Sequence, residues 1–210
     1  MIDVLVADDH TLVREGLKEI LSESSDIAVA GEASNGREVM VQISKYDYDA
    51  VLLDISMPGR SGLEVLKDLK AVKPNLPVLM LSMHPEELYA IRALKAGASG
   101  YLTKDAAPDE LIQAVRKICA GGRYVTASLA EKLAFQLTGG LEGNLHEKLS
   151  DRQYEIMCLI ARGKTVSEIA NELSLSVKTV STHRARLLEK MGMKTNAEIM
   201  HYCIQNGLVD

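Results

Sequence analysis

Residues 50–62 read AVLLDISMPGRSG, and this stretch decides which fold the chain can adopt. Four apolar residues lead directly into the carboxylate of Asp54, and Pro58, Gly59 and Gly62 interrupt the pattern before another helix begins. A short apolar run bounded by turn-forming residues predicts a buried parallel strand. Because ligands bind outside the carboxyl ends of such strands, Asp54 is predicted to point into a site. A loop-capping role for this single carboxylate stays open at this point.

The first 120 residues repeat this alternation of strand and helix five times. The apolar runs read IDVLVA, IAVAGEA, AVLLD, PVLMLS and SGYLTK. Amphipathic spacing predicts helices near residues 12–22, 37–46, 63–72, 85–96 and 108–120. Strict alternation indicates an α/β fold, a doubly wound (βα)5 parallel-sheet domain with right-handed crossovers. No G-x-G-x-x-G follows the first run, which argues against a dinucleotide-binding domain.

Acidic and hydroxylic side chains follow the predicted strands at the edge where the strands end. In chain order they are Asp8 and Asp9, Asp54, Ser82, and Thr103 with Lys104. Clustered carboxylates disfavour one another's charge unless a cation lies among them. Mg²⁺ takes one or two protein carboxylates and keeps waters and a phosphate oxygen, so the pattern predicts a magnesium site. His10 and His84 flank this edge and are interpreted as surface histidines near turns.

These residues, with the MPG after Asp54 and the Lys-Asp pair after the fifth strand, make residues 1–120 resemble the receiver domains of two-component response regulators. The resemblance implies that Asp54 is the phospho-acceptor and that Mg²⁺ is bound by Asp9, Asp54, the backbone carbonyl of Ser56 and, through water, Asp8. It also implies a switch hydroxyl, a phosphate-binding cation and an aromatic switch that turns inward after phosphorylation, namely Ser82, Lys104 and Tyr101. No P-loop lysine or kinase signature is present, so the phosphodonor is expected to be a partner, a sensor histidine kinase.

Composition predicts a soluble, cytoplasmic protein of two domains. Hydrophobic residues make up 47% and charged residues 25%, and no apolar run reaches the ~18 residues of a membrane span. Met1 is followed at once by the strand-like IDVLVA, so no secretory signal is expected. Three distant cysteines fit neither a disulfide framework nor a zinc site and are predicted to be core thiols: Cys119, Cys158 and Cys203.

Charge divides the chain unevenly. Residues 1–120 carry 13 Lys and Arg against 19 Asp and Glu, whereas residues 148–210 carry 9 against 7. The acidic part repels nucleic acid, and the second part need not. Between them, residues 121–147 contain GGRY and the glycine-rich LTGGLEGNLHE, which predict an interdomain linker. Leucine spacing predicts a short helix in this linker, over residues 128–137.

Residues 148–210 begin with strong helix-start signals. Ser150 with Gln153, and Thr165 with Glu168, form capping-box patterns. A third helix, expected over residues 177–191, is longer and basic, so the pattern predicts an all-α helix-turn-helix domain. The 3.6-residue period of an α-helix places five apolar residues on one face of this third helix: Val177, Val180, Leu187, Leu188 and Met191.

Residues 148–210 resemble the C-terminal effector domain of the NarL/FixJ (LuxR-type) regulators, and the stretch from Leu149 to Met193, including K-T-V at residues 178–180, follows the family's pattern closely. The resemblance implies that Lys178 and Thr179 contact phosphate. The small and hydroxylic residues at the centre of the polar face, and the basic residues around them, suit a major groove. The predicted DNA-binding set is Lys178, Thr179, Ser181, Thr182, Arg184, Ala185, Arg186 and Lys190. The last helix, residues 196–206, resembles the one that pairs two effector domains on DNA.

Both resemblances predict a non-enzymatic response regulator. It would be phosphorylated on Asp54 and would then bind promoter double-stranded DNA as a homodimer. A magnesium-dependent aspartyl-phosphate phosphatase is the first alternative, but such enzymes usually carry D-x-D where this chain has Asp8-Asp9-His10. The second alternative is a receiver whose helical output domain binds protein or RNA, which holds only if residues 148–210 fail to bind duplex DNA.

Overall fold

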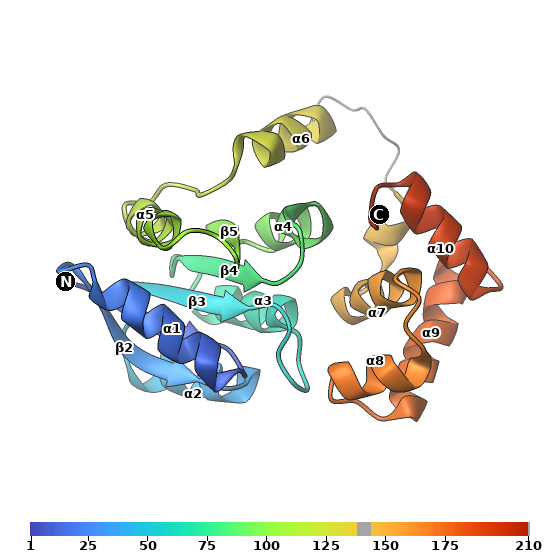
Figure 1. Ribbon diagram of the computed structural model, residues 1–210, viewed down its shortest axis with the longest axis horizontal. Coiled ribbons are helices and arrows are strands. Elements are labelled where there is room, and N and C mark those ends of the chain that lie inside the picture. Colours follow the sequence, from blue (N-terminus) through green and yellow to red (C-terminus); the bar gives the residue numbers. More distant parts are fainter. Residues whose placement is uncertain (138–143, 210) are drawn as a thin grey trace. The chain divides into compact units, whose positions relative to one another are not determined.

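The computed structural model describes residues 1–137 and 144–209 (Figure 1). The chain forms two compact units, Met1–Leu133 and Ala134–Asp210. The predicted linker includes this division, and its glycines Gly139, Gly140 and Gly143 lie outside the described residues. Each unit has buried apolar residues of its own, as expected of units able to fold separately.

A five-stranded parallel sheet forms the centre of the first unit, in the order β2-β1-β3-β4-β5. The strands are β1 Ile2–Ala7, β2 Ile27–Ala33, β3 Ala50–Asp54, β4 Val78–Ser82 and β5 Gly100–Thr103. Asp54 pairs with Leu81, and Ser82 pairs with Thr103, so the ends of the three strands share one edge. The strand order reverses its direction beside β1, which leaves a crevice between the exits of β1 and β3. The predicted doubly wound fold is confirmed.

Helices cover both faces of this sheet (Figure 1). Contacts join α1 to α5 and α2 to α3, as right-handed crossovers require for this strand order. The helices are α1 Thr11–Ser22, α2 Gly36–Lys45, α3 Gly62–Val72, α4 Glu86–Lys95 and α5 Pro108–Cys119, followed by α6 Ala127–Leu137. The first five agree with the predicted ranges to within one residue at each end. α1 and α2 contact β2, α3 contacts β3, α4 contacts β5, and α5 contacts β3, β4 and β5. The apolar side chains of β3 and β4 are buried.

The loop between β3 and α3 returns very close to the strand it has left. The Gly62 N–H donates to Ile55 O at 2.8 Å, and the Ser61–Glu64 capping box starts α3 immediately afterwards. A Cβ on Gly62 would lie 2.0 Å from Asp54 O. Only glycine allows this approach, so Gly62 sets the path of the backbone directly behind the Asp54 side chain.

The described residues of the second unit form helices and no strand. Its elements are the 3₁₀ turn η1 Leu145–Lys148 and the helices α7 Asp151–Ala161, α8 Val166–Glu172, α9 Val177–Met191 and α10 Asn196–Gln205. α7 contacts α8, α9 and α10 and is the centre of the packing. Across residues 1–137 and 144–209, no helix combines the length and apolar composition that crossing a bilayer requires.

Two details of the predicted cores are wrong. Val177 is 52% exposed, because it is the first residue of α9 and its side chain extends beyond the end of the packed stripe. The other four predicted apolar positions of this helix are buried: Val180, Leu187, Leu188 and Met191. Cys119 is only partly buried at the end of α5, whereas Cys158 and Cys203 are core thiols as predicted.

We predict that Gly62→Ala destabilises the first unit by roughly 1–3 kcal/mol, because the added methyl overlaps a backbone oxygen that cannot rotate away. Gly16→Ala is the matched control: no atom lies within 4 Å of its new Cβ, and alanine favours the helix interior. Urea unfolding followed by circular dichroism measures both. Equal midpoints for Gly62→Ala and the parent chain would show that the loop relaxes without cost.

Candidate functional site

The carboxylate of Asp54 lies buried at the end of β3 and faces two charged neighbours. Lys104, directly after β5, places Nζ 3.0 Å from Asp54 Oδ2 and 2.6 Å from Asp8 Oδ2. The Lys104 backbone N–H donates to Ser82 O at 2.8 Å, which joins the exit of β5 to the end of β4. Both Asp54 oxygens are buried without a hydrogen bond of ordinary geometry from a described residue, and the Lys104 ammonium is the positive charge beside them.

Burial shifts the proton equilibria of this group. Burial raises the pKa of the Asp54 carboxyl, Lys104 opposes that rise, and the negative charge of Asp8 adds to it. Burial also acts to lower the pKa of Lys104, but Asp54 and Asp8 outweigh it and the pKa is raised. The single ammonium group of Lys104 compensates only one of the two carboxylates, and the remaining negative charge favours a further cation.

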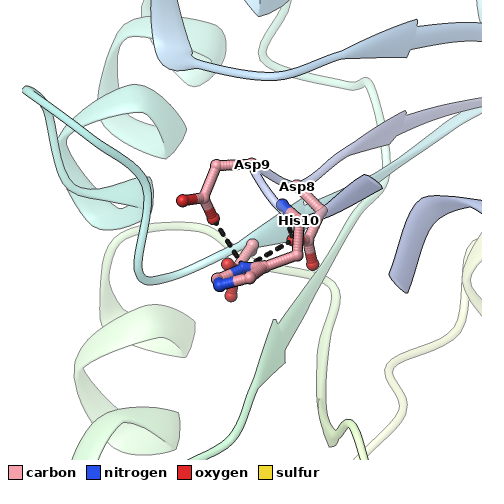
Figure 2. A group of neighbouring side chains, drawn as sticks. Asp8, Asp9 and His10 are labelled. Atoms are coloured by element: carbon pink, nitrogen blue, oxygen red, sulfur yellow. Dashed lines mark hydrogen bonds and ion pairs between the residues drawn. The ribbon is translucent and has the colours of Figure 1, made fainter. Parts of the chain in front are cut away.

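Asp9 and His10 extend this cluster toward the surface. Ligand atoms of Asp8, Asp9, His10 and Asp54 all lie within 4.8 Å of one another. Figure 2 shows the side chains of Asp8, Asp9 and His10 converging at the end of β1. Hard carboxylate oxygens, four of them buried without a hydrogen-bond partner among the described residues, fit Mg²⁺. Ser56 has an exposed side chain, so a contribution from it would come through its backbone carbonyl.

The two predicted switch residues meet at one turn. The Ser82 hydroxyl accepts the His84 N–H at 2.9 Å, and the Tyr101 hydroxyl donates to His84 O at 2.9 Å. Both side chains are buried. The inward position of Tyr101, which the resemblance assigned to the phosphorylated state, is the one that this structure has.

In the second unit, α8 and α9 form the predicted helix-turn-helix. Ser174 has a φ of 52°, a left-handed conformation that reverses the chain between the helices. Ser176 caps α9 by accepting the Thr179 N–H at 3.0 Å, and the two hydroxyls lie 2.8 Å apart. Thr182 donates its hydroxyl proton to Lys178 O at 2.9 Å, so its oxygen is left to act as an acceptor.

The predicted DNA-binding residues divide into two groups. The exposed residues on the polar face of α9 are Lys178, Ser181, Thr182, Ala185 and Arg186, with Thr179 partly buried at the cap. The remaining two, partly buried Arg184 and exposed Lys190, already make hydrogen bonds within the unit. Arg184 Nε donates to Asn196 Oδ1 at 2.7 Å, and Lys190 Nζ donates to Gln153 Oε1 at 3.0 Å. Both therefore lie against the starts of neighbouring helices.

A parallel sheet with an acidic edge, followed by a helix-turn-helix, defines a class of bacterial regulators. Residues 4–116 match the family described as the response regulator receiver domain. Residues 147–203 match the family described as bacterial regulatory proteins, luxR family. The protein is therefore a response regulator in which a receiver domain precedes a LuxR-type DNA-binding domain.

Similar proteins extend over the whole chain. Response regulator UvrY of Escherichia coli (strain K12) is 37% identical over 209 residues, 99% of this chain and 96% of that protein. Response regulator GacA of Pseudomonas protegens is 36% identical over 210 residues, 100% of this chain and 99% of that protein. The structure of RcsB from Salmonella enterica serovar Typhimurium, bound to promoter rprA in the presence of phosphomimetic BeF3−, has a TM-score of 0.65 and 26% identity, with 96% of this chain and 97% of that chain covered. The chain belongs to the NarL/FixJ family of two-component response regulators, which are DNA-binding transcription regulators.

One member of the cluster was missed by the reasoning from sequence. His10 was interpreted as a surface histidine, and it is exposed, but its Nδ1 lies 2.9 Å from Asp9 Oδ1. A signal was present in the sequence, because histidine directly after two acids stands at an N-cap position that usually holds Ser, Thr, Asn or Asp.

We predict that, in chelator, Asp54→Asn raises the free energy of unfolding of the first unit at neutral pH. The folded pKa of Asp54 is raised, so its ionised form opposes folding above that pKa, and the gain should shrink as pH falls toward the ordinary value of ~3.9. Denaturant unfolding across this pH range measures it.

Lys104→Met provides the opposite expectation at the same site. It leaves Asp8 and Asp54 buried without a counter-charge and should cost about 3 kcal/mol in the same unfolding experiment.

An Asp54→Asn variant that is less stable than the parent chain at neutral pH would contradict the upward direction of the Asp54 pKa shift.

Proposed function

We propose that a sensor histidine kinase phosphorylates Asp54 and that the phosphorylated protein binds promoter DNA as a homodimer to regulate transcription. The observation that carries the proposal is the buried Asp54 carboxylate with the Lys104 ammonium 3.0 Å away, in a cluster with surplus negative charge. We assign the receiver to residues 1–120, the linker to residues 121–147 and the DNA-binding domain to residues 148–210.

The chemistry requires a nucleophile and charge compensation. Asp54 attacks the phosphorus of the donor, and the phosphorus–nitrogen bond to the kinase histidine breaks. Lys104 stabilises the negative charge on the transferred oxygens, and Ser82 donates its hydroxyl to one of them once the group is attached. Bound Mg²⁺ would add the charge neutralisation that one lysine cannot provide. Asp9, Asp54 and the Ser56 carbonyl would hold it, with Asp8 acting through water.

On the DNA side, α9 is the reading helix. Lys178 and Thr179 at its start contact phosphate, and Ser181, Thr182 and Ala185 face base edges. The Thr182 oxygen is left as an acceptor, which suits an amino group on adenine or cytosine. Arg186 adds phosphate contacts, and Arg184 and Lys190 do so after leaving Asn196 and Gln153. The RcsB structure bound to promoter rprA supports this use of the fold.

Phosphorylation acts through assembly. The phosphoryl group and the base-reading residues belong to different units, so a two-state element has to carry the signal. Ser82 and Tyr101 both bond to the backbone of His84, so a phosphate that recruits the Ser82 hydroxyl favours one arrangement of this turn. The surface beside α4 and β5 then favours the dimer, with a coupling of about 1–3 kcal/mol.

We expect phosphoryl labelling to require both Asp54 and a divalent cation. Labelling with a small phosphodonor should be lost in Asp54→Asn and in excess chelator, and should persist in Asp3→Asn, which changes an acid at the start of β1. Undiminished labelling in chelator would remove the metal from the mechanism. A phosphoryl group mapped to Asp8 would favour the phosphatase alternative.

Lys178→Ala should weaken binding to all DNA sequences alike and reduce the salt slope by about one unit, because one phosphate contact is lost. Thr182→Ala should instead change preference at one base pair by roughly 1–3 kcal/mol. Lys194→Ala, an exposed lysine beyond the end of α9, is the control. An unchanged salt slope in Lys178→Ala would show that this residue does not contact phosphate.

Phosphorylated protein should bind a mapped promoter with two half-sites more tightly than unphosphorylated protein, and Asp54→Asn should abolish the difference. Residues 148–210 should contact the same bases in both states. DNA titration at fixed salt, with analytical ultracentrifugation, measures affinity and assembly together. Equal affinity and equal oligomeric state with and without phosphorylation would exclude regulation through assembly.

A further inference from the structure

His10 presents its ring to the acidic cluster at the end of β1 (Figure 2). Nδ1 lies 2.9 Å from Asp9 Oδ1 and 3.4 Å from Asp8 Oδ1. The His10 side chain is 66% exposed, while Asp8 is fully buried. The imidazole therefore stands at the mouth of the site, between the solvent and the carboxylates.

In this position the His10 side chain does not cap the N-terminus of α1. His10 is the N-cap residue of α1, and its side chain makes no capping hydrogen bond. Seven described helices, α2, α3, α6, α7, α8, α9 and α10, begin instead on Asn, Ser or Thr whose oxygen accepts a backbone N–H. The Asp8 carboxylate accepts the His10 N–H at 2.8 Å, so this turn directs the ring away from the helix end and onto the acids.

The spacing fits the first coordination shell of one ion. Neighbouring ligands of an octahedral cation, with bonds of about 2.1 Å, are about 3 Å apart. The separation of 2.9 Å between His10 Nδ1 and Asp9 Oδ1 agrees with that value. An oxygen of the buried Asp54 carboxylate belongs to the same cluster, and neither Asp54 oxygen has a hydrogen bond of ordinary geometry among the described residues. One cation can therefore reach an imidazole nitrogen and carboxylate oxygens together.

We propose that His10 Nδ1 is a ligand of the divalent cation held by Asp9 and Asp54, and that it makes the site prefer first-row transition-metal ions to Mg²⁺. The inference rests on the cation site of the proposed function. Mg²⁺ takes oxygen ligands almost exclusively, whereas Co²⁺, Ni²⁺ and Zn²⁺ gain from imidazole nitrogen. His10 thus determines which ion occupies the receiver when both kinds are present.

Pulsed electron paramagnetic resonance of the full-length chain with Mn²⁺ tests the ligand directly, because a coordinated imidazole couples its ¹⁴N nucleus to the metal spin. The variant is His10→Ser, which supplies an N-capping hydroxyl like those of α3 and α7. His201→Ser, an exposed histidine on α10, is the matched control. We expect ¹⁴N coupling in the parent chain and the control, and its loss in His10→Ser with Mn²⁺ still bound.

Calorimetric titration measures the preference. His10→Ser should lower Co²⁺ affinity by about tenfold or more, the loss that even an outer-shell partner produces, and leave Mg²⁺ affinity within about twofold. Mn²⁺ that is displaced by Mg²⁺ but shows no ¹⁴N coupling in the parent chain would overturn the inference and leave the proposed function standing. Failure of the parent chain to bind either ion would overturn both. Unchanged circular dichroism confirms that the variant is folded.

Discussion

Three buried charges at one sheet edge, Asp8, Asp54 and Lys104, impose the constraint on which the first unit depends. Charges removed from water are tolerated only when partners are held at short distance. Parallel strands meet this need because their carboxyl ends lie side by side, and the contact between the Lys104 N–H and Ser82 O fixes the lysine. The group is nevertheless left with more negative than positive charge. Burial raises the pKa of Asp54, and the surplus negative charge favours a bound cation.

The loop between β3 and α3, which lies behind the Asp54 side chain, is also tightly constrained. Gly62 passes so close to the backbone of Asp54 that no side chain fits there. The turn that follows β4 is equally constrained, because Ser82 and Tyr101 bond to opposite sides of the His84 peptide backbone. Under the proposed function, a phosphoryl group on Asp54 would act on this turn through the Ser82 hydroxyl. Tightly packed surroundings convert such small shifts into a choice between discrete arrangements.

In the second unit the decisive constraint is the division of α9 into two faces. Val180, Leu187 and Leu188 are buried against its neighbours, which fixes the rotation of the helix about its axis. That rotation leaves Lys178 and Thr182 exposed, and it turns Arg184 toward Asn196. A basic residue on a reading helix is thus not automatically available for DNA. Its place relative to the buried face of the helix decides whether it is exposed or bonded to a neighbouring helix.

Local pattern by itself determined the order of strands and helices, the acidic strand ends and the two faces of α9. Each depends on periodicity, on turn residues or on the shared direction of parallel strands. The glycines that break the run after Asp54 were visible in the same way, although the close approach at Gly62 was not. Only the tertiary structure decided the rest: the exposure of Val177, the inward Tyr101, the engagement of Arg184 and Lys190, and the imidazole of His10 on Asp9. These depend on side-chain directions and on contacts between residues distant in the chain, and periodicity carries no information about either.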